Sequence, residues 1–234
     1  MKIKLIFLFI ISSQISFSQS VISDTLLQNV RQIRYKNNVA TGFFISVFNQ
    51  DYLVTVKHLF MEDNLNSGQE VEVLANNNSS WIRFKLDIFF HKDPNVDIVV
   101  LKVPSSKVNN YYNLLTTQPP LAQDCYFLGY PLIMGISEPR FGGYPIPFVK
   151  KGIISALGND EKGVGTIYVD AHNNQGFSGS PLIIIDNNKK PTIIGVVSGY
   201  LNENIQTNNG QIAINSGILL AHHFNYVYEI INRK

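Results

Sequence analysis

The chain has 234 residues, of which 45% are hydrophobic and 15% are charged, and its formal net charge is +2. This length and hydrophobic content suffice for a folded domain with its own core, and they exclude an intrinsically disordered protein. Lysine and arginine are scattered rather than clustered, so the charge pattern argues against a nucleic-acid partner.

The first residues have the layout of a secretory signal peptide. Lys2 and Lys4 precede an apolar run over residues 5–11, and small polar residues then lead to a Ser16-Phe17-Ser18 cleavage site. The alternatives are a buried strand and a membrane anchor, but the run is shorter than the roughly 20 residues of a spanning helix. We expect cleavage after residue 18, export to the periplasm or the medium, and no membrane anchor in the mature protein.

The rest of the chain has the pattern of short β-strands separated by turn residues. Alternating or continuous apolar runs predict a first set of strands at residues 41–47, 52–56, 70–74, 81–89 and 96–103. After a linker at residues 116–120, a second set is predicted at residues 125–128, 148–156, 166–169, 182–185, 192–197 and 211–220. This organisation indicates two all-β units, each a sandwich or a barrel.

The segment over residues 221–232 is the only one predicted to be helical. Phe224, Val227, Tyr228 and Ile231 fall on one apolar stripe at helical spacing. The protein should therefore end in a short amphipathic helix.

Metal and cofactor sites are not predicted. His222 and His223 would be adjacent on the helix and point in different directions, and His91 has no partner at metal-ligand spacing. Cys125 is the only cysteine, so no intramolecular disulfide is possible, and its apolar neighbours predict a buried, unreactive thiol. The sequence contains no phosphate loop and no dinucleotide-binding motif.

A serine flanked by glycines carries the strongest chemical signal. In Gly176-Phe177-Ser178-Gly179 the small residues allow a substrate carbonyl to approach the Ser178 hydroxyl. The backbone amides of Gly176 and Ser178 can converge on the oxyanion that forms during acyl transfer. Glycine-rich serine turns also occur in ordinary surface loops, so this motif needs catalytic partners.

His58 and Asp97 are the candidate partners. A serine hydroxyl needs a base to take its proton, and His58 follows a predicted strand. The base needs a carboxylate to orient it, and Asp97 stands at the edge of a buried apolar run, where a charge is costly without a partner. Asp93 is the alternative, but it precedes a proline in a predicted loop. The order His, Asp, Ser is one of the known orders of the catalytic triad.

With these residues, the chain resembles the trypsin-like peptidases, in particular the disulfide-free bacterial branch of high-temperature-requirement proteases and glutamyl endopeptidases. The shared motifs lie at residues 41–44, 53–58, 97–101, 129–131, 152–158, 176–181 and 194–199. The resemblance implies an all-β fold of two six-stranded β-barrels, over residues 19–115 and 116–234, with a C-terminal α-helix and the active site between the barrels. Residues 19–37 are either a short propeptide or a strand and helix packed on the barrels.

The chain departs from the family pattern next to two of its catalytic residues. Phe177 replaces the aspartate of pancreatic-type members and the asparagine that is frequent in the bacterial branch. Val56 and Lys57 precede His58 where small residues are usual. These departures leave open a protease-fold protein that binds peptides without cleaving them.

The resemblance also implies a specificity pocket. Its walls are expected at residues 171–175 and at Ser198, Gly199 and Tyr200. His172 takes the place of the aspartate at the base of a trypsin-type pocket, and Val197 takes the place of a histidine in the glutamyl endopeptidases. We expect a preference for small or medium apolar side chains. The sequence thus predicts an exported serine endopeptidase that cleaves proteins or peptides, with an esterase and a silent peptide-binding protein as alternatives.

Overall fold

The computed structural model of the protein describes residues 22–77, 80–104, 112–115, 117–139, 145–208 and 210–233. The predicted signal peptide, residues 1–18, lies outside these described residues. Within the described ranges, no helix has both the length and the apolar character needed to cross a membrane.

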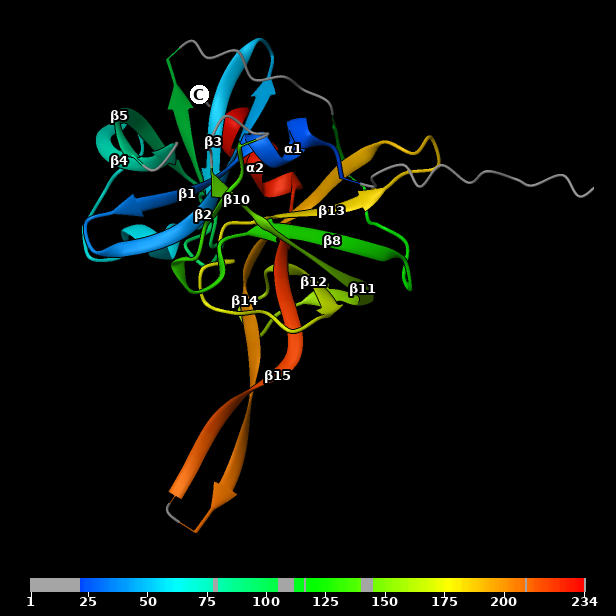
Figure 1. Ribbon diagram of the computed structural model, residues 1–234. Coiled ribbons are helices and arrows are strands. Elements are labelled where there is room, and N and C mark those ends of the chain that lie inside the picture. The colour runs from blue at the N-terminus through cyan, green and yellow to red at the C-terminus, as the bar shows by residue number, and fades with distance from the viewer. Residues whose placement is uncertain are drawn as a thin grey trace, which may run out of the picture.

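The first half of the chain forms a closed barrel (Figure 1). Its strands are β1 (Val30–Tyr35), β2 (Asn38–Val47), β3 (Gln50–Thr55), β4 (Gln69–Asn77), β5 (Ser80–Phe90) and β6 (Val99–Val103). They close in the order β1-β2-β3-β6-β5-β4. A short helix, α1 (Asp24–Asn29), is capped by Ser23 and leads directly into β1. Strand β1 lies between β2 and β4 in the closed barrel. Its residues therefore follow the second of the two alternatives for residues 19–37, a strand and helix packed on the barrels.

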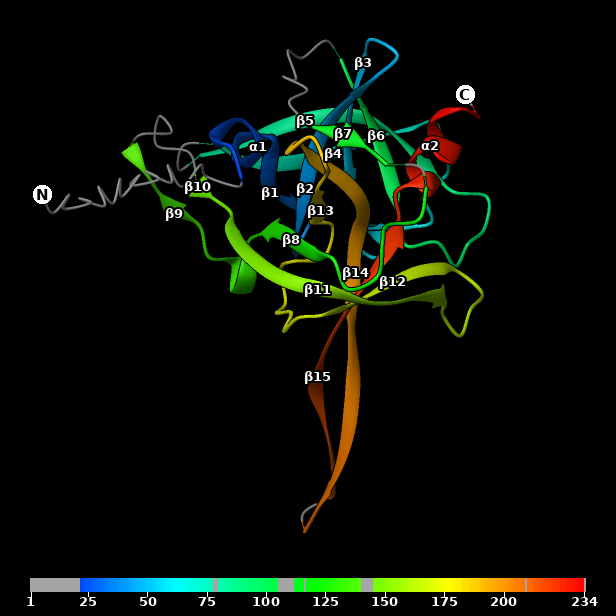
Figure 2. The same cartoon turned by 90° about the vertical axis from the view of Figure 1, so that its right-hand side faces the viewer.

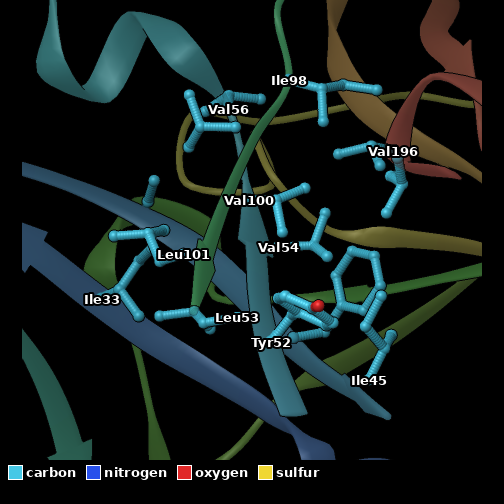
Figure 3. Packing of buried hydrophobic residues seen from close by; sticks show 14 of the residues in the cluster. Ile33, Ile45, Tyr52, Leu53, Val54, Val56, Ile98, Val100, Leu101 and Val196 are labelled. Carbon is cyan, nitrogen blue, oxygen red and sulfur yellow. The ribbon is translucent and has the colours of Figure 1, made fainter. Parts of the chain in front are cut away.

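Alternating apolar residues explain why these strands close into a barrel. Figure 3 shows Ile33 of β1, Leu53 of β3 and Leu101 of β6 side by side on one face of the sheet, and all three are buried. Ile45 of β2 pairs with Tyr52, the residue before Leu53, so these two buried side chains lie on the opposite face. Successive side chains of a strand point to opposite faces, so β3, which is buried at five successive positions, contributes apolar side chains to the packing on both of its faces. Val196, from the second half of the chain, belongs to the same cluster, so the core continues from one barrel into the other.

Strands β2 and β3, predicted at residues 41–47 and 52–56, pair as a hairpin with a tight turn. Val47 pairs with Gln50, which leaves only Phe48 and Asn49 in the loop. Both have positive φ angles, 51° and 59°, as a two-residue turn with the twist of the flanking strands requires.

The second half of the chain forms the second barrel. Its strands are β8 (Asp124–Gly129), β11 (Phe148–Asn159), β12 (Gly165–Asp170), β13 (Pro181–Ile185), β14 (Pro191–Thr207) and β15 (Gly210–His223). They follow the order β13-β8-β11-β12-β15-β14, and the pairing of β13 with β14 closes the ring. The smaller elements are β7 (Asn113–Leu114), β9 (Ile136–Ser137), β10 (Pro145–Ile146) and two 3-10 turns, η1 (Lys57–Phe60) and η2 (Pro131–Ile133). The predicted double-barrel fold is therefore confirmed.

Cys125 lies on β8 inside the second core. It is fully buried and free, and burial, with a smaller contribution from the Asp124 charge, raises the pKa of its thiol to about 12. The prediction that Cys125 is buried is confirmed. A thiol that stays protonated is a poor nucleophile.

Strand β14 is much longer than predicted, and β15 extends its predicted range of residues 211–220 by one residue at the start and three at the end. Beyond the barrel they continue as a two-stranded ribbon that projects away from the body (Figures 1 and 2). The predicted strand ended at residue 197, because the following residues are rich in asparagine and glutamine, which have low strand propensity.

The C-terminal helix, α2 (Asn225–Ile231), is confirmed, but its predicted start is wrong. Residues 221–223 belong to β15, where Ala221 pairs with Ile167 and His222 pairs with Thr166 of β12. Leu219 and Ala221 are both fully buried, so the strand period continues to this point. The side chains that α2 buries join the core cluster of the first barrel. The helix thus crosses back from the second barrel to the first.

Candidate active site

The antiparallel register of β3 and β6 brings His58 and Asp97 together. Thr55, the last residue of β3, pairs with Val99, the first residue of β6. His58 follows in η1, and Asp97 lies just before β6, so both stand at the same end of the barrel. The Asp97 Oδ2 atom lies 2.7 Å from His58 Nδ1, and Asp97 Oδ1 accepts a 2.8 Å hydrogen bond from the His58 backbone N–H. One carboxylate thereby holds both the ring and the backbone of the histidine.

The environment of His58 suits a general base. Burial by itself lowers the pKa of the imidazole, but the hydrogen bond and the charge of Asp97 together outweigh it and leave the pKa raised. The side chain remains 40% exposed. With Nδ1 engaged by the carboxylate, Nε2 is the ring nitrogen that can exchange a proton with a substrate or a nucleophile.

A second histidine lies behind the carboxylate. The Asp97 backbone N–H donates a 3.2 Å hydrogen bond to Nδ1 of His222, which is buried on β15. Burial lowers the pKa of His222, although the charge of Asp97 opposes this, and a neutral ring can accept that bond. The prediction that His222 and His223 lie on a helix is wrong, because β15 runs through His223 and places His222 against Asp97.

The loop that carries Ser178 depends on two glycines with left-handed backbone. Gly176 has φ +100° and Gly179 has φ +86°, a region that side chains other than glycine rarely adopt. Between them, Phe177 is fully buried and packs edge-on against Phe127, with ring centroids 5.0 Å apart. The phenylalanine that replaces the family's usual polar residue thus anchors the loop in the second core.

Thr41 of β2 ties this loop to the first barrel. Its backbone N–H donates a 2.9 Å hydrogen bond to the Ser178 carbonyl, and its hydroxyl donates a 2.6 Å bond to the Gly176 carbonyl. The same hydroxyl accepts a 3.2 Å bond from the Tyr130 N–H. The Thr41 carbonyl in turn accepts a 2.8 Å bond from the Thr55 hydroxyl, at the end of the strand that leads to His58. Buried hydrogen bonds therefore link the Ser178 loop to the strand before His58.

The polar groups around Ser178 are left available. The Ser178 hydroxyl hydrogen-bonds no other described residue, and the backbone N–H groups of Gly176 and Ser178 donate to none within the described ranges. The Gly176 carbonyl already accepts a hydrogen bond from the Thr41 hydroxyl. The backbone groups that remain available beside Ser178 are therefore N–H donors. Such a set of groups suits an acyl-transfer site.

An open pocket of about 490 Å³ adjoins His58 and Asp97. Its walls come from both barrels and include Ser198, Gly199 and Tyr200 of β14. The predicted substrate-binding strand and the histidine–aspartate pair therefore share one pocket. No group of three or more metal-ligating side chains occurs in the part of the chain that the structure describes.

His172 is not part of that pocket. Its side chain is exposed, its Nε2 atom lies 3.5 Å from the Asn174 amide nitrogen, and its carbonyl accepts a hydrogen bond from the Lys150 ammonium group. The buried neighbour is Asn173, which donates a 3.1 Å hydrogen bond to the Gly199 carbonyl. Of the residues predicted to determine specificity, Ser198, Gly199 and Tyr200 thus line the pocket beside His58 and Asp97, whereas His172 lies at the surface outside it.

A family model for the trypsin-like peptidase domain matches residues 40–196, which is more than half of the chain. The chain belongs to the trypsin-like peptidase family. The matched range includes the histidine, aspartate and serine discussed above. No curated protein matches the chain.

Solved structures share the fold of this trypsin-like peptidase at low sequence identity. The HtrA-type protease AlgW with a tripeptide has a TM-score of 0.61 and 19% identity, over 89% of this chain and 60% of that one. The serine endoprotease from Yersinia pestis has a TM-score of 0.61 and 16% identity, over 92% and 66%. A mutant of Rv3671c from M. tuberculosis H37Rv, in its inactive form, has a TM-score of 0.57 and 19% identity, over 89% and 87%. This chain therefore spans about two thirds or less of the first two proteins.

Three residues next to the candidate triad of this trypsin-like peptidase were not found from the sequence. Thr41 stands in a motif that the sequence analysis quoted, but nothing in the sequence indicates where its hydroxyl bonds. Asn173 lies in the expected pocket wall, and its role follows only from its contacts with Gly199 and Asn215. His222 was overlooked because the sequence analysis placed it on the C-terminal helix, away from Asp97.

We predict that Thr41→Val lowers kcat about 10- to 100-fold, because a small displacement of the oxyanion donors is costly in acyl transfer. Valine keeps the shape of threonine and the backbone bond to Ser178, but it releases the Gly176 carbonyl. Thr41→Ser retains the hydroxyl and should stay within about threefold of the parent. Steady-state kinetics of the three proteins test this. Equal losses in both variants, or a loss in KM alone, would show that Thr41 does not position the loop.

We predict that Gly179→Ala destabilises the fold by about 4 kcal/mol or more, at the upper end for single substitutions. A Cβ atom there would lie 2.0 Å from the Thr41 carbonyl oxygen, and the φ of +86° is itself strained for alanine. Gly163→Ala is the matched control. It has a similar φ of +80° but open space around the site, so it should cost only about 1–2 kcal/mol. Urea unfolding measures both, and equal losses would contradict the close packing at Gly179.

Proposed function

We propose that this trypsin-like peptidase is an exported serine endopeptidase with His58, Asp97 and Ser178 as its catalytic triad. The observation that carries the proposal is the Asp97 carboxylate, which holds both the ring and the backbone of His58 beside an open pocket. The predicted signal peptide over residues 1–18 supports export.

In the first proposed step, the Ser178 hydroxyl oxygen attacks the substrate carbonyl while His58 Nε2 takes the hydroxyl proton. Asp97 keeps the other ring proton on Nδ1 and stabilises the imidazolium that forms. The backbone N–H groups of Gly176 and Ser178 would donate to the oxyanion. His58 then gives its proton to the leaving amine, which departs and leaves Ser178 acylated.

In the second proposed step, water replaces the amine. His58 takes a proton from the water, the hydroxide attacks the acyl carbonyl, and the proton returns to Ser178 as the acid product leaves. The same donors serve both tetrahedral intermediates. The chain's own residues thus supply every proton transfer in this scheme.

We further propose that the side chain before the scissile bond is small or medium-sized and apolar. Val197 is fully buried, and Ala171 is buried in the expected wall. Asn173 supplies an uncharged amide there, and its Oδ1 atom is buried without a hydrogen-bond partner among the described residues. Mass-spectrometric profiling of cleaved peptides checks this proposal, and a strict preference for arginine or glutamate would refute it.

The proposed activity is tested by incubating the mature protein with unfolded β-casein and, separately, with p-nitrophenyl acetate. An endopeptidase is expected to cut casein at internal bonds, which sequencing of the products by mass spectrometry identifies. Turnover of the ester without cleavage of casein would favour an esterase. Turnover of neither, by a folded protein, would favour a silent peptide-binding protein.

A further inference from the structure

The ribbon formed by β14 and β15 beyond the barrel is the largest feature that the proposed mechanism does not use. Its strands pair from Asn202↔Asn215 to Thr207↔Gly210, and it projects from the body as a separate arm (Figure 2). A two-stranded ribbon by itself is marginally stable in water. A long arm of this kind therefore needs a physical reason in the function of the protein.

The ribbon has one apolar face. Residues directly opposite each other in an antiparallel pair share a face, and here Glu203 pairs with Ile214 and Ile205 pairs with Ile212. Leu201, two residues before Glu203 on the same strand, belongs to this face as well. Its four apolar side chains are between 39% and 53% exposed. Glu203 and Thr207 lie on the same face, which we call the apolar face after its four apolar side chains.

The opposite face of the ribbon is almost entirely made of amide side chains. It carries the pairs Asn202↔Asn215, Asn204↔Ala213 and Gln206↔Gln211. Between Tyr200 and Ile218 the only charged residue is Glu203. The ribbon therefore offers apolar contact and backbone hydrogen bonds, and almost no charge, to whatever binds it.

The ribbon continues directly from the candidate active site. Ser198, Gly199 and Tyr200, which line the pocket with His58, are the residues of β14 from which the arm extends. Among the described residues, β14 beyond Val197 pairs with no strand other than β15. Asn173 donates to the Gly199 carbonyl, so the strand edge that remains open lies beyond Gly199, along the ribbon. An open strand edge can bind an extended polypeptide as an additional strand.

We propose that the ribbon is an extended binding site for the part of an unfolded polypeptide substrate that precedes the cleaved bond. The substrate would lie antiparallel to β14. With its scissile bond near Ser178, its N-terminal side would then run past Tyr200 toward the tip of the ribbon. Its alternate side chains would share the apolar face with Leu201 and Ile205, so the preferred segment has apolar residues at every second position. The direction of the bound chain rests on the proposed function, whereas the binding itself does not.

Continuity with the pocket favours a substrate segment over a second copy of this chain. The open edge and two of the four apolar side chains, Leu201 and Ile205, belong to the strand that lines the pocket beside His58. A substrate strand would use the face and the edge together, whereas two ribbons packed through their apolar faces would leave the open edge unused. Self-association is therefore an outcome of the test rather than the proposal.

The test is peptide binding by the inactive Ser178→Ala protein, measured by fluorescence anisotropy. The probe is a fluorescein-labelled peptide of roughly ten residues, which at ~3.3 Å per residue spans the ribbon. It has leucine or valine at alternate positions, and a matched peptide carries asparagine there instead. We expect the apolar peptide to bind at least about tenfold more tightly than the matched one, since it gains several buried apolar contacts.

Two double variants in the Ser178→Ala background locate the binding surface. Ile205→Thr with Ile214→Thr keeps β-branched residues on the apolar face but removes much of its apolar area, and should weaken binding about tenfold. The matched control, Asn204→Thr with Gln211→Thr on the amide face, should bind like the parent. Unchanged binding in the first pair, or equal losses in both, would overturn the proposal.

The same proteins separate this inference from the proposed function. If the apolar-face variant loses a concentration-dependent dimer in sedimentation velocity while peptide binding is unchanged, the ribbon is a self-association surface and the proposal is wrong. Because Ser178→Ala binds without cleaving, a failed activity test of the parent leaves this binding result intact. Conversely, an active protease whose ribbon variants bind normally keeps its proposed function and loses only the extended site.

Discussion

Replacing Ser178 by alanine is expected to lower kcat/KM on peptide substrates by about 10⁴-fold or more, because alanine has no oxygen to attack the carbonyl. The fold should be unaffected. The Ser178 hydroxyl makes no hydrogen bond to another described residue, and the backbone bonds of the loop to Thr41 do not involve the side chain. Initial rates on an internally quenched peptide, beside thermal unfolding of both proteins, measure the two quantities.

Ser180→Ala is the matched control for this substitution. Ser180 is fully buried two residues further along the loop, and its hydroxyl oxygen has no hydrogen-bond partner among the described residues. Removing it therefore breaks no side-chain hydrogen bond, and activity should stay within about threefold of the parent. If Ser180→Ala abolished activity and Ser178→Ala did not, the nucleophile would have been assigned to the wrong serine.

Asp97→Asn is expected to lower kcat by about 10⁴-fold near neutral pH. Asp97 Oδ1 accepts from the His58 backbone N–H and Oδ2 faces the ring. In the variant, the amide oxygen would keep the backbone bond, so the NH₂ group would face His58 Nδ1. That nitrogen would then have to accept a hydrogen bond, the ring proton would move to Nε2, and Nε2 could no longer take the serine proton.

The pH profile distinguishes this effect from a general loss of structure. The base must be neutral, so activity falls as the pH drops through the pKa of His58. Asp97 raises that pKa against the opposing effect of burial, which places the acid limb of the parent above the ordinary histidine value of about 6.5. In Asp97→Asn only the effect of burial on the His58 pKa remains, and burial lowers it. The acid limb of the residual activity should therefore move to lower pH. Asp93→Asn, the other aspartate considered from the sequence, should leave the limb in place. The opposite pattern would make Asp93 the orienting residue.

The barrels could be predicted because their strands have strong local patterns. Apolar residues alternate along the second half of β5, which buries one face, whereas β3 is a continuous apolar run that is buried on both faces, and both patterns are visible in the sequence. The pairing of His58 with Asp97 could also be proposed, because a carboxylate at the edge of a buried run needs a partner. In these places local pattern and tertiary structure agree.

Other features depend on contacts that no local pattern reveals. The start of α2 was placed too early because the apolar period of β15 runs into that of the helix near Ala221. The β14 half of the ribbon was missed because its asparagines and glutamine have low strand propensity, although Ile205 pairs with Ile212 of the predicted β15 strand. Thr41 and Asn173 became candidates only when the fold brought residues far apart in the chain into hydrogen-bonding contact.

Labelling of the purified mature protein by a fluorophosphonate probe tests the proposed triad most directly, since the probe reacts only with an activated serine. The parent should be labelled at Ser178, as identified by mass spectrometry of the adduct, and neither Ser178→Ala nor His58→Ala should be labelled. If the folded parent is not labelled, or if His58→Ala is labelled as fast as the parent, then His58 does not activate Ser178. The proposed catalytic assignment would then be wrong.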